Sequence, residues 1–207
     1  KIANINSIDE IFIVTNNKFY LNFVDWKKGV DNSKIKIIND ETITNESRLG
    51  AIGDIDFVIK KENIEDDLIV IAGDNLFEFN ITHLHNLFIE KKSSVVALYD
   101  ILDKNKAANK LGVVTMDGNK KIINFEEKPD NPKTSIVSTA CYILSKKHLK
   151  LLDKCIIEKN KPDNLGEFIN WLSINSEVYG HVFSGKWFDI GSKEQLQIAR
   201  DYFNSKK

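Results

Sequence analysis

Short runs of apolar and β-branched residues alternate with segments of helical period through the first half of the chain, and this alternation limits the fold more than any other feature. We expect strands at 10–15, 34–38, 68–72 and 95–99, and helices at 18–28, 51–61 and 81–91. Strands that alternate with helices pair mainly in parallel, and the helices cover both faces of the sheet. The sequence therefore predicts an α/β fold built on a mostly parallel sheet.

The alternation of strands and helices changes in the second half of the chain. Residues 111–129 hold two strand-like runs on either side of Asp117-Gly118, a dipeptide typical of hairpin turns. Further strands are expected at 135–144 and 177–183, and further helices at 145–159, 165–174 and 192–203. Ser192 and Gln195 fit a capping box at the start of the last helix. Because no repeat, low-complexity segment or linker interrupts the sequence, we expect a single domain over residues 1–207.

Charge and apolar patterning exclude two classes of partner. The chain carries 29 Lys and Arg against 30 Asp and Glu, a net charge of −1, so no overall positive field attracts nucleic acid or an anionic membrane. No apolar run approaches the roughly 18–20 residues of a membrane span. Cys141 and Cys155 lack metal-ligand spacing and are expected to be reduced, which favours a cytoplasmic location. The oligomeric state stays open, with a homo-oligomer among the alternatives.

The first residues of the chain predict that part of the domain lies upstream of Lys1. The sequence opens on Lys1, and Ile2 and Ile5 have the spacing of a helix tail ahead of the strand at 10–15. A chain that starts inside a helix is expected to start inside its domain. We therefore predict an N-terminally truncated domain with further elements upstream of Lys1.

A carboxylate follows the strand expected at 68–72, which has the composition of a strand buried on both faces. Gly73, Asp74 and Asn75 come directly after it. Ligands of open α/β sheets bind beyond the carboxyl ends of the strands, and a carboxylate held rigidly there suits a Mg²⁺ ion with few protein ligands. The alternative is that Asp74 caps a turn, since Gly-Asp-Asn is also good turn chemistry.

Two later stretches carry further candidate residues. Asp189 lies in Gly-Lys-Trp-Phe-Asp-Ile-Gly-Ser and is either a functional carboxylate or a helix-entry residue. Glu127 and Lys128 lie at the end of a strand and precede Pro129. A carboxylate accepts hydrogen bonds from sugar hydroxyls, and an ammonium group is a compact partner for phosphate. The alternative is a charged loop that ends at a proline.

These motifs, taken in order, resemble the sugar-1-phosphate nucleotidylyltransferases, the nucleotide-sugar pyrophosphorylases, of which glucose-1-phosphate thymidylyltransferase is a well-known type. The order is Gly-Asp-Asn after a strand, Leu-Gly-Val-Val, Glu-Lys-Pro, and Trp-Phe-Asp-Ile-Gly. The resemblance covers essentially the whole chain. It implies a Rossmann-like mixed, mostly parallel sheet of the nucleotide-diphospho-sugar transferase type with a β-hairpin insertion. It also implies that Asp74 and Asp189 hold a Mg²⁺ ion bridging a nucleoside triphosphate and a sugar-1-phosphate.

The resemblance assigns roles to other residues as well. Glu127 would contact sugar hydroxyls, and Lys128 would contact the sugar phosphate. Further substrate contacts are expected from Gly112, Ala140 and Asn75, and nucleobase contacts from Leu49, Gly50 and Gly53. Ala140 stands where the family often has glycine beside the sugar, and Ala51 and Ile52 replace the usual Thr-Ala of the nucleobase segment.

One part of the family pattern has no counterpart in residues 1–207. The family opens with a strand and a glycine-rich loop containing Gly-Thr-Arg, which cradle the triphosphate. The resemblance therefore implies that this chain alone is a weak catalyst or none. Two alternatives remain from the sequence: a non-catalytic regulatory or assembly subunit of the same fold, and a metal-dependent glycosyltransferase of similar topology. The second would usually carry an Asp-X-Asp motif, whereas Gly-Asp-Asn-Leu-Phe offers one carboxylate.

Overall fold

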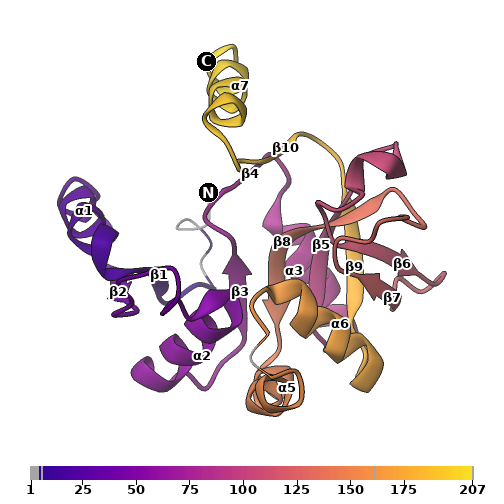
Figure 1. Ribbon diagram of the computed structural model, residues 1–207, viewed down its shortest axis with the longest axis horizontal. Helices are drawn as coiled ribbons and strands as arrows, with labels where there is room; N and C mark the ends of the chain where they lie inside the picture. The colour runs from indigo at the N-terminus through magenta and orange to yellow at the C-terminus, as the bar shows by residue number, and fades with distance from the viewer. Residues whose placement is uncertain (1–4, 6, 161, 207) are drawn as a thin grey trace. The chain divides into compact units, whose positions relative to one another are not determined.

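The structure is a computed structural model that describes residues 5, 7–160 and 162–206, and the chain forms two compact units (Figure 1). Unit 1 contains the described residues up to Glu65 together with Leu152–Asn164. Unit 2 contains Asp66–Leu151 and the described residues from Leu165 onward. The expected helix tail at the start falls largely outside the described residues, which include Ile5 but not Ile2, and Ile5 is not helical. The single domain over 1–207 stays a prediction.

Unit 1 is built on one parallel strand pair. Its elements are β1 (Ile11–Thr15), α1 (Asn17–Lys28), β2 (Ile35–Asn39), α2 (Gly50–Glu62) and α5 (Leu152–Glu158). β1 and β2 pair in parallel from Ile11 opposite Ile35 to Thr15 opposite Asn39, as the alternation predicted. Its core is formed by the buried residues Ile35, Ile38, Ile52, Val58, Leu152 and Cys155.

Local sequence sets the helix ends of unit 1. The Asn16 side chain accepts a hydrogen bond from the Phe19 backbone N–H at 3.2 Å and so caps the start of α1. The same helix ends at Gly29. α2 ends at Asn63, whose backbone is left-handed with φ of 52°, a conformation that asparagine tolerates better than most residues.

Unit 2 contains a mixed sheet. Its strands are β3 (Leu68–Ile71), β5 (Val95–Asp100), β6 (Val113–Met116), β7 (Ile122–Glu126), β8 (Ile136–Leu144) and β9 (Tyr179–Phe183). The order is β7-β6-β8-β5-β9, and β3 pairs with β8. β8 is antiparallel to both β3 and β5, whereas β5 and β9 are parallel. The mixed α/β fold is confirmed, although β3 and β5 do not pair because β8 lies between them.

The helices of unit 2 follow the apolar pattern. They are α3 (Ile81–Lys91), α4 (Lys146–Leu149), α6 (Leu165–Asn175) and α7 (Lys193–Asn204), with the 3₁₀ helix η2 (Lys104–Ala107). The inward-facing residues of α3 are all buried, as their helical spacing predicted. Ser192 caps α7 by accepting from the Gln195 N–H at 3.2 Å, and the Gln195 side chain accepts from the Gly191 N–H at 2.8 Å. Among the described residues, no helix is both long and apolar enough to cross a membrane.

Two expectations from the sequence need correction, and two short strands were missed. The helix expected over 145–159 is two helices, α4 and α5, because the chain turns at Lys150 and Leu151. The strand expected to be buried on both faces, β3, is only half-buried along its length, and within the described residues it pairs on one side only. Two short strands were not expected at all: β4 (Asn75–Phe77) and β10 (Trp187–Asp189).

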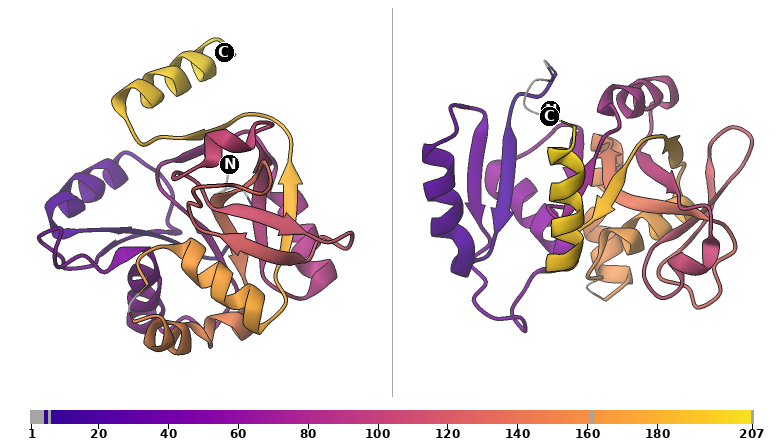
Figure 2. Two further views of the ribbon diagram at one scale, coloured as in Figure 1. Left: turned by 45° about the vertical axis from the view of Figure 1, so that its right-hand side comes forward. Right: turned by 90° about the horizontal axis from the view of Figure 1, so that it is seen from above.

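Within unit 2, α7 follows the β4–β10 ribbon and stands away from the six-stranded sheet (Figures 1 and 2). Glu78, which follows β4, accepts a hydrogen bond from the Tyr202 hydroxyl at 2.8 Å and forms an ion pair with Lys206. Phe188 of β10 packs against the rings of Tyr202 and Phe203. α7 is therefore fixed to the ribbon by one carboxylate and one aromatic cluster.

A buried histidine connects three segments of unit 2. His148 of α4 bonds through Nδ1 to the Ser94 hydroxyl and through Nε2 to the Ser176 hydroxyl, each at 2.8 Å. Ser94 also accepts from the Ser145 N–H at 2.9 Å. Burial, and then the charge of Lys147, lower the pKa of His148. The imidazole is therefore held neutral.

His148 should make unit 2 sensitive to acid. A histidine with a lowered pKa stabilises the fold above its unfolded-state pKa of about 6.5, and the stability falls as the pH drops below that value, because the unfolded chain binds the proton first. The variant His148→Gln loses a buried hydrogen bond, so we expect it to be about 1 kcal/mol less stable at pH 7.5. Its stability should then change less between pH 7.5 and 5.5 than that of the wild type, as measured by urea unfolding. An equal change in both proteins would contradict this role.

Candidate functional site

The predicted site residues fall into two groups, one in each unit. Leu49, Gly50 and Gly53 belong to unit 1. Unit 2 holds the others: Asp74, Asn75, Gly112, Glu127, Lys128, Ala140 and Asp189.

The β4–β10 ribbon places Asp74 beside Asp189. The two strands are antiparallel, with Asn75 opposite Asp189 and Phe77 opposite Trp187. The Ile190 N–H donates to the Asp74 carbonyl at 2.9 Å and extends the pairing by one residue. The two aspartates, far apart in sequence, therefore lie on paired chain segments, and a Mg²⁺ ion held by both stays a prediction.

A chain of side-chain hydrogen bonds orients Asp74. The Trp187 indole N–H donates to the Asn75 side-chain oxygen at 2.6 Å, which leaves the Asn75 amide nitrogen to donate to Asp74 at 2.8 Å. The indole is itself packed against the Tyr99 ring, with centroids 5.7 Å apart. One carboxylate oxygen of Asp74 is thus positioned through Asn75. The expected contact of Asn75 with substrate stays a prediction.

Electrostatic interactions connect Asp189 with two other predicted residues. Neighbouring atoms partly desolvate its carboxylate, although the residue as a whole is exposed. This desolvation, and then repulsion from Asp74, raise the pKa of Asp189, whereas the charge of Lys128 lowers it. The charge of Lys128 therefore acts on the Asp189 carboxylate.

The two carboxylates suit a divalent cation. Each repels the other, and a bound cation between them removes that repulsion. Mg²⁺ prefers carboxylate oxygens and usually keeps several waters or substrate oxygens rather than an all-protein cage. Among the described residues no group of three or more His, Cys, Asp or Glu could hold a metal ion. Asp74 and Asp189 are the carboxylates that would hold Mg²⁺, and this assignment stays a prediction.

The Glu127 carboxylate is tightly enclosed by glycines. It follows β7 and lies against Gly112 and against Gly166 in the first turn of α6. A Cβ atom on Gly166 would lie 2.9 Å from Glu127 Cδ, and one on Gly112 would lie 2.7 Å from the Phe125 ring and 3.1 Å from Glu127 Oε2. Both positions therefore need glycine for Glu127 to keep this place.

Burial has the largest effect on the pKa of Glu127 and raises it. The charge of Lys128 lowers this pKa, and the charge of Glu167 raises it. Gly166 and Glu167, in the first turn of α6 next to this carboxylate, were not among the residues expected from the sequence. The available signal was Leu-Gly-Glu at the start of an apolar helix, because glycine in a helix is unfavourable unless something approaches closely.

Two predicted residues have left-handed backbones. Lys128 has φ of 46° directly before Pro129, and Ala140 has φ of 51° where the register of β8 against β5 shifts. Such conformations are costly for residues other than glycine and gather at functional sites. The Ala140 carbonyl accepts from the Ala72 N–H at 3.0 Å, so this irregular point of β8 is bonded to the segment that leads into Asp74.

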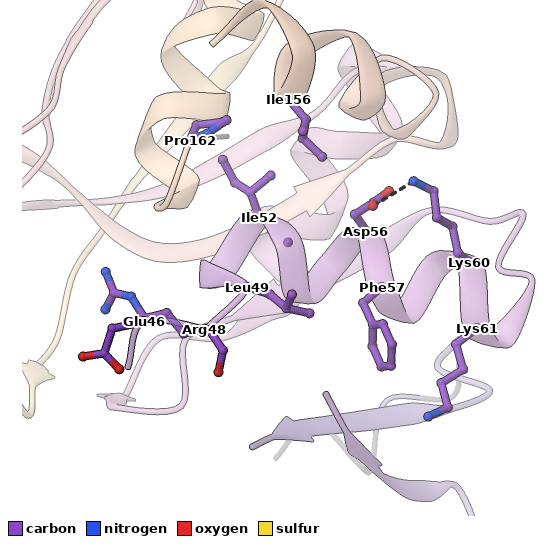
Figure 3. A pocket seen from close by; sticks show the side chains of 12 residues that line it. Glu46, Arg48, Leu49, Ile52, Asp56, Phe57, Lys60, Lys61, Ile156 and Pro162 are labelled. Carbon is purple, nitrogen blue, oxygen red and sulfur yellow. Dashed lines mark hydrogen bonds and ion pairs between the residues drawn. The ribbon is translucent and has the colours of Figure 1, made fainter. Parts of the chain in front are cut away.

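Leu49 and Gly53 of the unit 1 group line an open pocket of about 730 Å³ (Figure 3). Leu49 and Ile52 at the start of α2, with Phe57, form an apolar part, and Ile156 and Pro162 face it from the segment around α5. Lys60 of α2 bonds to Asp56 at 2.8 Å at the pocket's charged end. An apolar surface beside charged groups can hold a planar, partly polar ring.

A second, more acidic pocket of about 410 Å³ adjoins Leu49 and Gly50. Burial, and then the neighbouring Asp40, raise the pKa of Asp54 to about 6. Its buried Oδ1 has no hydrogen-bond partner among the described residues. The Asp54 carboxyl is therefore partly protonated near pH 6.

Comparisons with known proteins agree with this arrangement. A model of the nucleotidyl transferase family matches residues 1–205. The bifunctional protein GlmU of Methanocaldococcus jannaschii is 27% identical over 201 residues, which cover 96% of this chain and 44% of that protein. The chain thus spans less than half the length of this relative.

Solved structures show the same fold. A UDP-glucose pyrophosphorylase complexed with UDP-glucose is 17% identical with a TM-score of 0.75, over 96% of this chain and 82% of the other. A protein described as a glucose-1-phosphate thymidylyltransferase from Bacillus anthracis, in complex with a sucrose, is 22% identical with a TM-score of 0.70, over 94% and 76%. At these identities the likeness concerns the fold alone.

Gly166→Ala should destabilise the protein although glycine-to-alanine changes in helices usually stabilise. The added methyl group overlaps the Glu127 carboxylate, and overpacking of this kind costs about 1–3 kcal/mol. Gly118→Ala is the control, because a Cβ there meets nothing within 4 Å. In a Glu127→Ala background most of the loss caused by Gly166→Ala should disappear. Chemical denaturation of the four variants would contradict this account if the loss were the same with and without Glu127.

Proposed function

Because the chain belongs to the nucleotidyl transferase family, we propose that it transfers a nucleotidyl group from a nucleoside triphosphate to a sugar-1-phosphate, releasing pyrophosphate and forming a nucleotide-sugar. The proposed acceptor is a hexose-1-phosphate such as glucose-1-phosphate. The observation that carries the proposal is the pairing of β4 with β10, which makes neighbours of Asp74 and Asp189, with the charge of Lys128 acting on the same carboxylate.

The reaction needs alignment more than chemical activation. A phosphate oxygen of the sugar-1-phosphate attacks the α-phosphorus, and the bond to the bridging oxygen breaks as pyrophosphate leaves with its electron pair. The nucleophile is already anionic, so no covalent intermediate on the protein is required. The protein's contribution is therefore to hold two anionic substrates together and to offset their repulsion.

Named side chains account for these tasks. Asp74 and Asp189 would hold Mg²⁺, which when bound supplies the positive charge that offsets repulsion between the phosphates. The Lys128 ammonium would bind the sugar phosphate. The buried Glu127 carboxylate would accept hydrogen bonds from sugar hydroxyls, and its enclosure by glycines fixes its direction.

The nucleotide would bind against unit 1. Leu49, Gly50 and Gly53 line the pockets there. Gly112 and Ala140 would border the sugar. A cytoplasmic location is proposed with this function, in agreement with the two buried free thiols of Cys141 and Cys155.

Residues 1–207 alone should turn over slowly or not at all. They carry no Gly-Thr-Arg motif of the kind that stabilises the transferring phosphoryl group, and such charge clamps are worth orders of magnitude in rate. The assay is pyrophosphate release from ATP, CTP, GTP, UTP and dTTP with glucose-1-phosphate and Mg²⁺, with a UDP-glucose pyrophosphorylase as positive control. Turnover on the order of 1 s⁻¹ or more by these residues would contradict the prediction.

Lys128→Ala should weaken the binding of one substrate and not of the other. The ammonium group is proposed to meet only the sugar phosphate, and a hydrogen bond to a charged group contributes about 1.5–3 kcal/mol, so binding of glucose-1-phosphate should weaken about 10-fold or more. Nucleotide binding should change less than about two-fold on the same reasoning. Calorimetry on the protein measures both, using α,β-methylene nucleotides in which the scissile bond cannot break.

Lys128→Arg is the matched control for that experiment. It keeps the positive charge and has the same strained backbone position, so it should retain most of the affinity for glucose-1-phosphate. Equal losses of both ligands in Lys128→Ala would show that Lys128 does not distinguish them.

A further inference from the structure

Strand β10 presents its side chains to two sides. Side chains along a strand alternate between its two faces, so Trp187 and Asp189 point to one side and Phe188 points to the other. On the first side, the Trp187 ring packs against the Tyr99 ring of β5, with centroids 5.7 Å apart. The face of β10 that carries Asp189 is therefore attached to the sheet of unit 2 through Trp187.

Helix α7 covers the other face of β10. The Phe188 ring lies against the rings of Tyr202 and Phe203, with centroids 5.3 and 5.9 Å away. Ala199 is fully buried and shares this face of the helix, because residues three and four positions apart are neighbours on a helix. In Figure 1, α7 accordingly lies next to β4 and β10 rather than against the sheet. α7 thus packs on the ribbon from the side opposite to the Asp189 side chain.

Both ends of α7 are also bonded to the ribbon. At its start, the Gln195 side chain accepts a hydrogen bond at 2.8 Å from the N–H of Gly191, two residues after β10. Near its end, the Tyr202 hydroxyl donates to the Glu78 carboxylate at 2.8 Å. Glu78 in turn bonds to the residue before β10, because its carboxylate accepts from the Lys186 N–H and its own N–H donates to the Lys186 carbonyl, each at 3.0 Å. The helix therefore holds β10 at both of its ends.

The ribbon is short for the charge that it carries. Only three residues of each strand are paired, and an isolated two-stranded ribbon is marginally stable at best in water. The Asp74 and Asp189 carboxylates repel each other, which works against the pairing. Contacts from outside the two strands must offset this repulsion, and α7 supplies them on the face that the sheet does not cover.

We propose that α7 is a positioning element for the metal site: its contacts with Phe188 and Glu78 keep β10 paired with β4 and so hold Asp189 in place relative to Asp74. This inference rests on the proposed function, in which the two aspartates bind Mg²⁺. Tyr202 acts through Phe188 and Glu78 and does not itself bind the metal. When the ribbon opens, the fraction of molecules with both carboxylates in place falls, and the apparent dissociation constant of the metal rises in inverse proportion.

Tyr202→Ala and Ile198→Ala test the proposal as a matched pair on one helix. Both changes are neutral in charge, so the long-range attraction of the protein for a cation stays the same. Tyr202→Ala removes an aromatic contact and a hydrogen bond to a carboxylate, so Mn²⁺ should bind about five-fold or more weakly. Ile198 is 54% exposed, and its truncation should change the affinity less than about two-fold. Tyr202→Phe keeps the ring against Phe188 and should restore most of the affinity.

Electron paramagnetic resonance of free Mn²⁺ during a titration of the protein measures these affinities. Mn²⁺ is a suitable probe because it takes the same oxygen ligands as Mg²⁺. Amide hydrogen exchange gives a second readout that needs no metal. The Ile190 N–H, which donates to the Asp74 carbonyl, should exchange about five-fold or more faster in Tyr202→Ala. The Ala72 N–H, which donates to the Ala140 carbonyl of β8, should exchange at the wild-type rate.

The outcomes separate this inference from the proposed function. Wild-type exchange at Ile190 in Tyr202→Ala, equal acceleration at Ala72, or an equal loss of Mn²⁺ affinity in Ile198→Ala would overturn the positioning role. So would wild-type Mn²⁺ affinity in Tyr202→Ala when Asp189→Asn weakens binding. Mn²⁺ binding that is unchanged in Asp189→Asn would instead overturn the metal site of the proposed function.

Discussion

The antiparallel pairing of β4 with β10 is the interaction on which the proposed site depends. It is only three residues long on each strand, yet it makes neighbours of two carboxylates from distant parts of the chain. Trp187 and Asn75 within the ribbon then orient Asp74, and Glu78 at its end holds α7. A short ribbon can hold like charges together because backbone hydrogen bonds and aromatic packing offset their repulsion.

At the proposed sugar site, close packing holds a carboxylate in place. Glu127 occupies a space that exists only because Gly112 and Gly166 lack side chains, and burial raises its pKa. The next residue, Lys128, has a strained left-handed backbone and acts electrostatically on both Glu127 and Asp189. Strain and desolvation of this kind gather at functional sites because the surrounding fold tolerates them there.

The sequence predicted most elements because their apolar periods are strong, as in α3 and the β6–β7 hairpin. It did not reveal that β8 separates β3 from β5, because strand order depends on contacts between distant segments. β4 and β10 were missed because three residues are too few to show a period of two. The expectation that Asp74 and Asp189 lie close together came from a family resemblance. That Gly166 must be glycine to leave room for Glu127 could be seen only in the structure.

Anomalous diffraction from Mn²⁺ bound in place of Mg²⁺ tests the central claim most directly. Crystals of the protein would be grown with an α,β-methylene nucleoside triphosphate and glucose-1-phosphate. The account predicts a metal ion within coordination distance, about 2.0–2.6 Å, of carboxylate oxygens from both Asp74 and Asp189. A metal ion that leaves either carboxylate uncoordinated would contradict it.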